Sequence, residues 1–132
     1  MKNILLIILA LGISYSCKND DDFNPNTELI GNWKLIEVYV DPGDGSGTFS
    51  SVKSNKTITF RNDGTITSNG NLCDMSINSD SQTSGTYSKA EMSFNSADCN
   101  NPTYDFTFEQ NGNILIINYP CFEACQSKYI KE

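Results

Sequence analysis

Histidine is absent from the 132 residues of this chain, and its absence excludes several common types of active site. Neither a Ser-His-Asp nor a Cys-His catalytic unit can form without it, and zinc or haem sites with imidazole ligands are excluded as well. Catalysis would have to depend on carboxylates, tyrosines, lysines or thiols, and no pattern of these groups indicates it. We therefore expect neither an enzyme nor a bound cofactor.

Basic residues are also scarce, since nine Lys and Arg stand against 16 Asp and Glu and the net charge is −7. Binding to nucleic acid needs basic patches that displace phosphate counterions, and polybasic attachment to a membrane surface needs a similar excess of Lys and Arg. The acidic balance therefore predicts no nucleic-acid partner. We expect a monomer.

Long apolar runs are scarce too, and the clearest one covers residues 4–13, just after Lys2. A membrane-spanning helix needs about 20 apolar residues, whereas a basic tip, about ten apolar residues and a small-residue cleavage region are typical of a secretory signal. Ser14 and Ser16 supply the small residues, and Cys17 stands at the junction.

This junction resembles the lipobox of bacterial lipoproteins, in which the cysteine is diacylated and becomes the first residue of the mature chain. The resemblance implies that Cys17 anchors the protein in a lipid bilayer, because each buried methylene contributes about 0.8 kcal/mol. Residues 18–22 (Lys-Asn-Asp-Asp-Asp) resemble the tag that directs lipoproteins of Bacteroidota-type bacteria to the outer face of the outer membrane. We expect a surface-exposed position there. The alternatives are a periplasm-facing position and an ordinary cleaved signal beside a chance cysteine.

The chain therefore divides into three parts. Residues 1–16 are expected to be a lipoprotein signal peptide, and their removal takes away Lys2 and leaves a net charge of −8. Residues 17–27 are expected to be the acylated cysteine with an acidic, flexible tether. Residues 28–132 suit one domain with one core.

Short alternating segments separated by Gly, Asn, Asp and Pro predict an all-β domain without a long helix. Eight to ten strands are expected among residues 33–40, 48–52, 56–61, 65–68, 72–78, 84–88, 91–95, 104–109, 114–119 and 126–130. Residues 28–30 could form one helical turn before the first strand. Consecutive hairpins favour an up-and-down antiparallel meander, which closes most simply as a small β-barrel.

Two motifs add a family resemblance. Gly31-Asn32-Trp33 starts the first strand, and residues 60–65 (Phe-Arg-Asn-Asp-Gly-Thr) form a hairpin signal. Over residues 28–131 the chain resembles the short lipocalin-like lipoproteins of Bacteroidota. In that family the Trp plugs the closed end of the barrel and the Gly permits close backbone packing. The Thr-Asp-Tyr motif and the late barrel Arg of lipocalins have no match here.

Cys73, Cys99, Cys121 and Cys125 form an even set in an exported chain, which predicts two disulfides. Cys121 and Cys125 bracket the turn between the last two strands, where opposed Cα atoms lie near the 5.5 Å that a disulfide needs, so we expect these two to pair. Cys73 and Cys99 then pair by elimination. A four-thiolate zinc site and a redox-active cysteine pair are the alternatives.

Seven aromatic residues are candidates to line a pocket for a small apolar or amphipathic ligand: Trp33, Tyr39, Phe60, Tyr104, Phe106, Phe108 and Tyr119. The same residues could instead fill the interior of an eight-strand barrel. Asp41, Asp44 and Ser46 on a Gly-rich loop are weak candidates for a calcium site, because a plain hairpin loop already accounts for them. Two hypotheses follow: a non-catalytic ligand binder, or a structural or interaction lipoprotein with a filled barrel.

Overall fold

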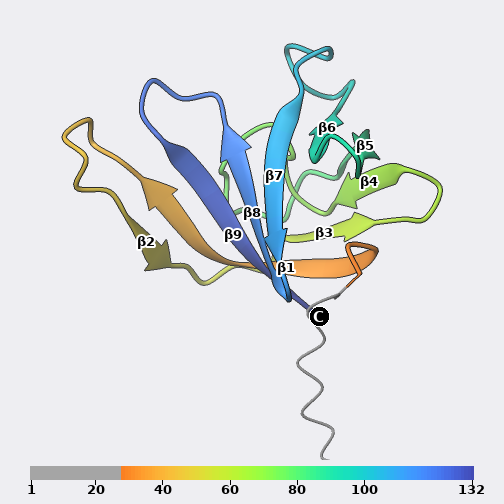
Figure 1. Ribbon diagram of the computed structural model, residues 1–132, viewed down its shortest axis with the longest axis horizontal. Helices are drawn as coiled ribbons and strands as arrows, with labels where there is room; N and C mark the ends of the chain where they lie inside the picture. Colours follow the sequence, from red (N-terminus) through yellow and green to blue (C-terminus); the bar gives the residue numbers. More distant parts are fainter. Residues whose placement is uncertain (1–27) are drawn as a thin grey trace, which may run out of the picture.

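The computed structural model describes residues 28–132, and these residues form one antiparallel sheet of nine strands without a helix (Figure 1). The strands are β1 (Gly31–Val40), β2 (Thr48–Ser51), β3 (Thr57–Phe60), β4 (Thr65–Ser68), β5 (Thr83–Ser88), β6 (Ser93–Asn95), β7 (Phe106–Asn111), β8 (Ile114–Tyr119) and β9 (Cys125–Lys131). The predicted fold class is confirmed. The signal peptide, Cys17 and the tether lie outside the described residues. No helix of residues 28–132 is long and apolar enough to span a membrane.

Strand β1 closes the sheet because it pairs with three other strands. Its first half lies beside β3, with Gly31 opposite Phe60, and its second half lies beside β2, with Val40 opposite Thr48. Its other edge pairs with β9 along almost its whole length. Strands β1 and β3–β9 therefore form a closed eight-strand barrel, and β2 continues the line of β3 as a flap outside the ring (Figure 1). The β1–β9 closure and both disulfides lie within residues 28–132, so we expect this segment to fold on its own.

The interior of the barrel is filled with side chains. Strands β3 and β4 alternate half-buried threonine with buried isoleucine, phenylalanine or serine, as expected for a sheet with one face toward the core. The largest buried apolar side chains, each at most 3% exposed, are Leu29, Trp33, Leu35, Ile58, Phe60, Ile66, Leu72, Phe94, Phe106, Phe108, Leu115, Ile117 and Tyr129. An eight-strand barrel has an interior that such side chains can just fill.

The barrel has two different ends. The closed end carries residues 28–30 and the hairpins at 61–64, 89–92 and 112–113, whereas the open end carries the loops 41–47, 69–82, 96–105 and 120–124. The open end lies at the top of Figure 1, and the described chain begins and ends at the bottom. A ligand that enters through the open end therefore approaches the barrel at the end farthest from residue 28.

Trp33 and Lys131 seal the closed end. The Trp33 indole N–H donates to the carbonyl of Leu29 at 2.8 Å, and the Lys131 ammonium lies 4.7 Å from the indole ring. Lys131 Nζ also donates to the carbonyls of Glu28, at 2.6 Å, and of Ile30. The helical turn expected at residues 28–30 is absent, because these carbonyls bind the lysine and the indole instead of later backbone N–H groups.

The position of Gly31 in the Gly-x-Trp motif requires a glycine for structural reasons. Gly31 has a φ of +123°, and a Cβ atom there would lie 3.0 Å from Lys131 Nζ. A larger residue would therefore be strained and would push away the ammonium group. Lysine rather than arginine supplies the positive charge beside the tryptophan in this chain.

Residues 72–78 form a loop, so the strand predicted there is wrong. The carboxamide of Asn71 accepts from the backbone N–H of Cys73 at 2.9 Å. The Asp74 carboxylate likewise accepts from the N–H of Ser76 at 2.8 Å. Such side-chain acceptors satisfy backbone donors locally and replace a strand ladder. Tyr104 is also outside its predicted strand, since β7 begins at Phe106.

Candidate functional site

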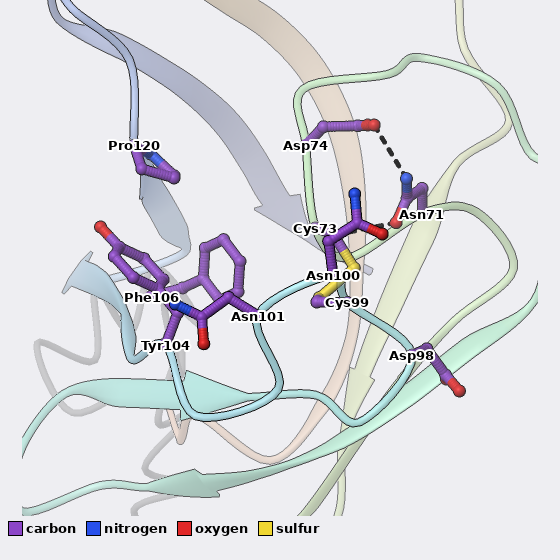
Figure 2. Close-up of a pocket in the computed structure, with 10 residues that line it drawn as sticks. All are labelled: Asn71, Cys73, Asp74, Asp98, Cys99, Asn100, Asn101, Tyr104, Phe106 and Pro120. Carbon is purple, nitrogen blue, oxygen red and sulfur yellow. Dashed lines mark hydrogen bonds between the residues drawn. A yellow bond between two sulfur atoms is a disulfide. The ribbon is translucent and has the colours of Figure 1, made fainter.

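A pocket of about 470 Å³ opens at the open end of the barrel (Figure 2). Its walls come from the loops 69–82 and 96–105, from the start of β7 and from the residue that follows β8. The lining residues are Asn71, Cys73, Asp74, Asp98, Cys99, Asn100, Asn101, Tyr104, Phe106 and Pro120. These loops are distant in sequence and meet because β4, β5, β6, β7 and β8 all end or begin at this end of the sheet.

One wall of the pocket is apolar. The rings of Tyr104 and Phe106 meet edge to face, with centroids 4.8 Å apart, and Pro120 lies beside them (Figure 2). Phe106 is buried, whereas Tyr104 is 36% exposed and faces the solvent opening. Rings in this position offer an apolar surface to a small molecule.

The facing wall is polar. The Asn71 carboxamide donates to the Asp74 carboxylate at 2.8 Å, and the side chains of Asn100 and Asn101 lie between this pair and the aromatic rings (Figure 2). Asp98 points away from the centre and accepts from the backbone N–H of Ser84 at 2.8 Å. Because this wall combines amide donors with carboxylate acceptors, it can hydrogen-bond a polar group of a ligand.

The Cys73–Cys99 disulfide joins the two loops that carry the polar wall, with a Cα–Cα distance of 5.5 Å. Beneath it, Leu72 is fully buried, and its backbone N–H donates at 3.0 Å to the Thr83 hydroxyl. The same hydroxyl donates to the carbonyl of Gly70 at 2.7 Å. The loop 69–82 is therefore held in place by the disulfide, by the buried side chain of Leu72 and by the backbone hydrogen bonds to Thr83.

Lys56 supports the same loop from inside the barrel. It precedes β3, shares the inward face with Ile58 and Phe60, and is fully buried. Its ammonium donates to the carbonyls of Ser76, at 2.7 Å, and Asp74, at 3.4 Å. Burial lowers the pKa of Lys56 to about 8, and the negative charge of Asp74 partly opposes this shift. The charge of Lys56 is thus directed to loop carbonyls.

Three buried hydroxyl groups lie in the barrel near the pocket. They belong to Tyr119 on β8 and to Ser127 and Tyr129 on β9, and their hydrogen-bond partners among residues 28–132 are one another. Burial raises the pKa of Tyr119 to about 12 and that of Tyr129 well above its usual range. Both phenols are therefore neutral at physiological pH.

The seven aromatic residues predicted as pocket-lining occupy three different places. Tyr104 and Phe106 line the pocket, and the Tyr119 ring packs against Phe106 with centroids 5.9 Å apart. Trp33, Phe60 and Phe108 are buried in the filled interior. Tyr39 lies on the flap side, where its ring centroid is 5.4 Å from that of Phe49.

The loop predicted as a weak calcium candidate is closed by its own side chains. The Asp41 carboxylate accepts from the backbone N–H groups of Gly43 at 2.8 Å and Gly45 at 3.1 Å. The Asp44 carboxylate accepts from the N–H of Ser46 at 2.9 Å. The pKa of Asp41 is lowered mainly by the hydrogen bond from the Gly43 backbone, and the pKa of Asp44 is lowered mainly by the hydrogen bond from the Ser46 side chain. Within residues 28–132, no three cysteine or acidic side chains gather as metal ligands.

The second disulfide joins Cys121 and Cys125 across the β8–β9 turn, with a Cα–Cα distance of 6.1 Å. Both disulfides match the pairs expected from the sequence. The four cysteines of the described chain are therefore engaged with one another as two bridges, and Phe122 is fully exposed at the tip of the small ring.

The polar part of the pocket was missed from the sequence. Asn71, Asp74, Asn100 and Asn101 are ordinary loop residues by composition, and Lys56 was assigned to a strand without a role. One feature of the sequence could have indicated part of this polar wall. Asn71 and Asn100 lie close to Cys73 and Cys99, so the expected disulfide already placed these two polar segments side by side.

Residues 29–92 match a family model of the lipocalin-like domain. This match covers slightly less than half of the chain, from the entrance of the barrel to the turn after β5. Neither the curated proteins nor the solved structures contain a match to the chain. The partial family match and the closed eight-strand barrel agree on a lipocalin-like fold, which generally serves binding rather than catalysis.

Proposed function

We propose that this protein is a monomeric, lipid-anchored lipoprotein that binds a small amphipathic ligand in its open-end pocket and catalyses no reaction. One observation carries the proposal: a pocket of about 470 Å³ with one apolar and one polar wall opens at the mouth of a lipocalin-like barrel. Ligand sites typically occupy about 300–1,000 Å³ and combine apolar lining with a few polar groups. The filled interior confines the ligand to the mouth.

The anchor is proposed from the sequence and fits the orientation of the barrel. An acylated Cys17 would connect to the barrel through residue 28, which lies at the closed end, opposite the pocket. The pocket would then face away from the bilayer, toward molecules outside the cell if the protein lies on the surface of the outer membrane. Acyl chains bind the bilayer with about 0.8 kcal/mol per methylene, which suits permanent attachment.

Ligand binding is tested with residues 28–132 and the neutral fluorescent amphiphile N-phenylnaphthylamine. We expect the fluorescence to rise on binding and Tyr104→Ala to weaken binding several-fold, because it removes the exposed ring of the apolar wall. The matched control is Tyr39→Ala, which removes a half-buried tyrosine of β1 that packs against Phe49 of the flap, and it should leave the affinity unchanged. The proposal fails if the dye does not bind and native mass spectrometry finds no co-purified lipid.

The anchor is tested separately in the full chain. Cells that express the protein are labelled with radioactive palmitate, and the parent chain should incorporate the label while Cys17→Ser should not. Protease treatment of intact cells then distinguishes a surface position from a periplasmic one. Equal labelling of both chains would exclude acylation at this residue without affecting the ligand proposal.

A second function is favoured by a different observation. The large apolar side chains that are exposed in the described chain all lie at the open end: Val40, Ile77, Tyr104 and Phe122. Apolar groups gathered at one end can contact a protein partner. An interaction lipoprotein with a filled barrel would therefore also use this end. It would bind no dye, and its partner binding would depend on Phe122.

A further inference from the structure

The two ends of the barrel differ in charge as well as in packing. The open-end loops 41–47, 69–82, 96–105 and 120–124 contain no lysine or arginine. Their acidic residues are Asp41, Asp44, Asp74, Asp80, Asp98, Asp105 and Glu123. The segments of the closed end carry both signs, namely Glu28, Arg61, Asp63, Lys89 and Glu91. The open end therefore has an excess of negative charge that the closed end lacks.

This excess is not neutralised by ion pairs within the described chain. Among residues 28–132, the salt bridge joins Lys128 of β9 to Glu37 of β1, so no open-end carboxylate has a lysine or arginine in salt-bridge contact. Lys56 donates to loop carbonyls from the interior, but it is fully buried and does not line the pocket. The summed field at this end therefore attracts cations toward the pocket and repels anions.

The pocket itself suits an organic cation better than a metal ion. Its apolar wall is aromatic, and the ring of Tyr104 is accessible because this residue is 36% exposed. The face of an aromatic ring attracts an ammonium group. Asp98 points away from the centre, which leaves Asp74 as the carboxylate of the polar wall (Figure 2). A hard metal ion needs several oxygen ligands together, and residues 28–132 contain no group of three acidic or cysteine side chains that could hold one.

We propose that the open-end pocket selects cationic amphiphiles, with the alkyl chain on Phe106 and Pro120 and the ammonium group between the Tyr104 ring and the Asp74 carboxylate. This inference rests on the proposed function and adds the charge of the ligand's polar group. A neutral alcohol gains no Coulomb energy in this field, and a carboxylate is repelled by it. Because Asp74 and Asp98 are both exposed, each contributes modestly, and the affinity depends on the charge of the whole open end.

The experiment compares amphiphiles with the same ten-carbon chain and different polar groups. Their binding to residues 28–132 is measured by isothermal titration calorimetry below the critical micelle concentrations, and circular dichroism checks the fold. We expect decyltrimethylammonium to bind about tenfold more tightly than decanol, and decanoate more weakly than decanol. The advantage of the cation should shrink when the salt concentration rises from about 20 mM to about 300 mM, because salt screens exposed charges.

The source of the ammonium group is tested with decylphosphocholine. This compound carries the same quaternary ammonium as a choline lipid, but its phosphate cancels the positive charge. We expect it to bind no more tightly than decanol, because the field of the open end acts on net charge. An affinity equal to that of decyltrimethylammonium would show that a zwitterionic lipid head group is sufficient, and it would overturn the selection for a net cation.

Charge-neutralising variants locate the effect. Asp74→Asn should weaken decyltrimethylammonium binding about threefold and leave decanol binding unchanged, because it removes the charge of the polar wall and keeps an amide of the same shape. The double variant Asp80→Asn/Glu123→Gln neutralises two open-end carboxylates that do not line the pocket, and it should cause a smaller loss. The matched control is Glu91→Gln at the closed end, which should leave the affinity for the cation unchanged.

The outcomes separate this inference from the proposed function. If neither N-phenylnaphthylamine nor any of the amphiphiles binds, the proposed function fails and this inference fails with it. If the dye and decanol bind but decyltrimethylammonium binds no more tightly than decanol, the pocket remains and its selection for cations is overturned. Equal losses for the cation and decanol in Asp74→Asn would show that the variant disturbs the loop, and an unchanged affinity in the double variant would then also overturn the role of charge.

Discussion

Both ends of the barrel are tied by a lysine that donates to backbone carbonyls, but the two lysines have different surroundings. At the closed end, Lys131 binds the carbonyls of residues 28 and 30 and covers the indole of Trp33. At the open end, Lys56 binds the carbonyls of Asp74 and Ser76 from beneath a disulfide-linked loop. The first arrangement fills its end completely, whereas the second holds a loop in place beside a pocket. The same interaction thus seals the barrel at one end and shapes a binding surface at the other.

This comparison predicts that stability depends mainly on the closed end. Trp33→Ala removes a fully buried indole and its hydrogen bond to Leu29, so we expect unfolding in urea to require about 4 kcal/mol less free energy. Dye binding per folded molecule should persist, because the pocket is at the other end. A loss of binding larger than the loss of folded protein would show that the two ends are coupled.

The Cys73–Cys99 bridge is expected to have the next largest effect. It closes a loop with a separation of 26 residues, against 4 for Cys121–Cys125, so the chain-entropy model gives about 3.5 and about 2 kcal/mol for their removal. Replacing both cysteines of each pair by alanine and measuring unfolding compares them directly. Only the first double variant should also weaken dye binding. Equal weakening by the second pair would contradict the assignment of the pocket wall.

The buried charge of Lys56 predicts a pH dependence of stability. Its pKa of about 8 in the folded protein lies below its ordinary value of 10.5, so the unfolded chain binds more protons between these values. The free energy of unfolding should therefore rise by about 2 kcal/mol from pH 7 to about 9.5. Above pH 10 the raised pKa values of Tyr119 and Tyr129 should reverse the trend, because the tyrosines then ionise first in the unfolded chain.

Lys56→Met is the control for this titration, since it keeps the apolar stem and removes the ionisable group. The pKa of Lys131 is also lowered by burial, but this side chain is partly exposed and should contribute less. The variant should therefore show a much flatter profile over the same pH range. An unchanged slope would assign the effect to another group.

The smallest expected effect on stability is at the rim of the open end. Phe122 is fully exposed, so Phe122→Ser should change the free energy of unfolding by no more than about 0.5 kcal/mol. Thermal unfolding measured by circular dichroism checks this. A larger loss would mean that the ring packs against part of the protein. Under the interaction hypothesis, the same variant would weaken the partner complex while the barrel stays intact.

The barrel itself was predictable because most of its strands carry the two-residue alternation that one buried face imposes. The errors fell where local hydrogen bonds replaced that pattern. Residues 72–78 alternate Cys, Met and Ile with Asp, Ser and Asn like a strand, but Asn71 and Asp74 satisfy their own loop. Only Leu72 of this segment enters the core completely.

The pocket was much less predictable, because it depends on how loops far apart in sequence meet. Sequence patterns favoured aromatic residues as a group, but strand register alone decided that Phe60 and Phe108 fill the interior while Phe106 reaches the mouth. The buried cluster of the Tyr119, Ser127 and Tyr129 hydroxyls had no local signal either. Ser127 and Tyr129 read as alternate residues of a strand, and only the pairing of β8 with β9 sets them near Tyr119.

The pairing of the first strand with the last also governs when this protein can fold. Because β1 pairs with β9, which ends at Lys131, the ring cannot be completed until residues 31–131 are all available. Contacts between segments so distant along the chain make folding slow. Late closure would suit the proposed export, because a polypeptide that is still open can cross a membrane and then form its two disulfides on the oxidising side.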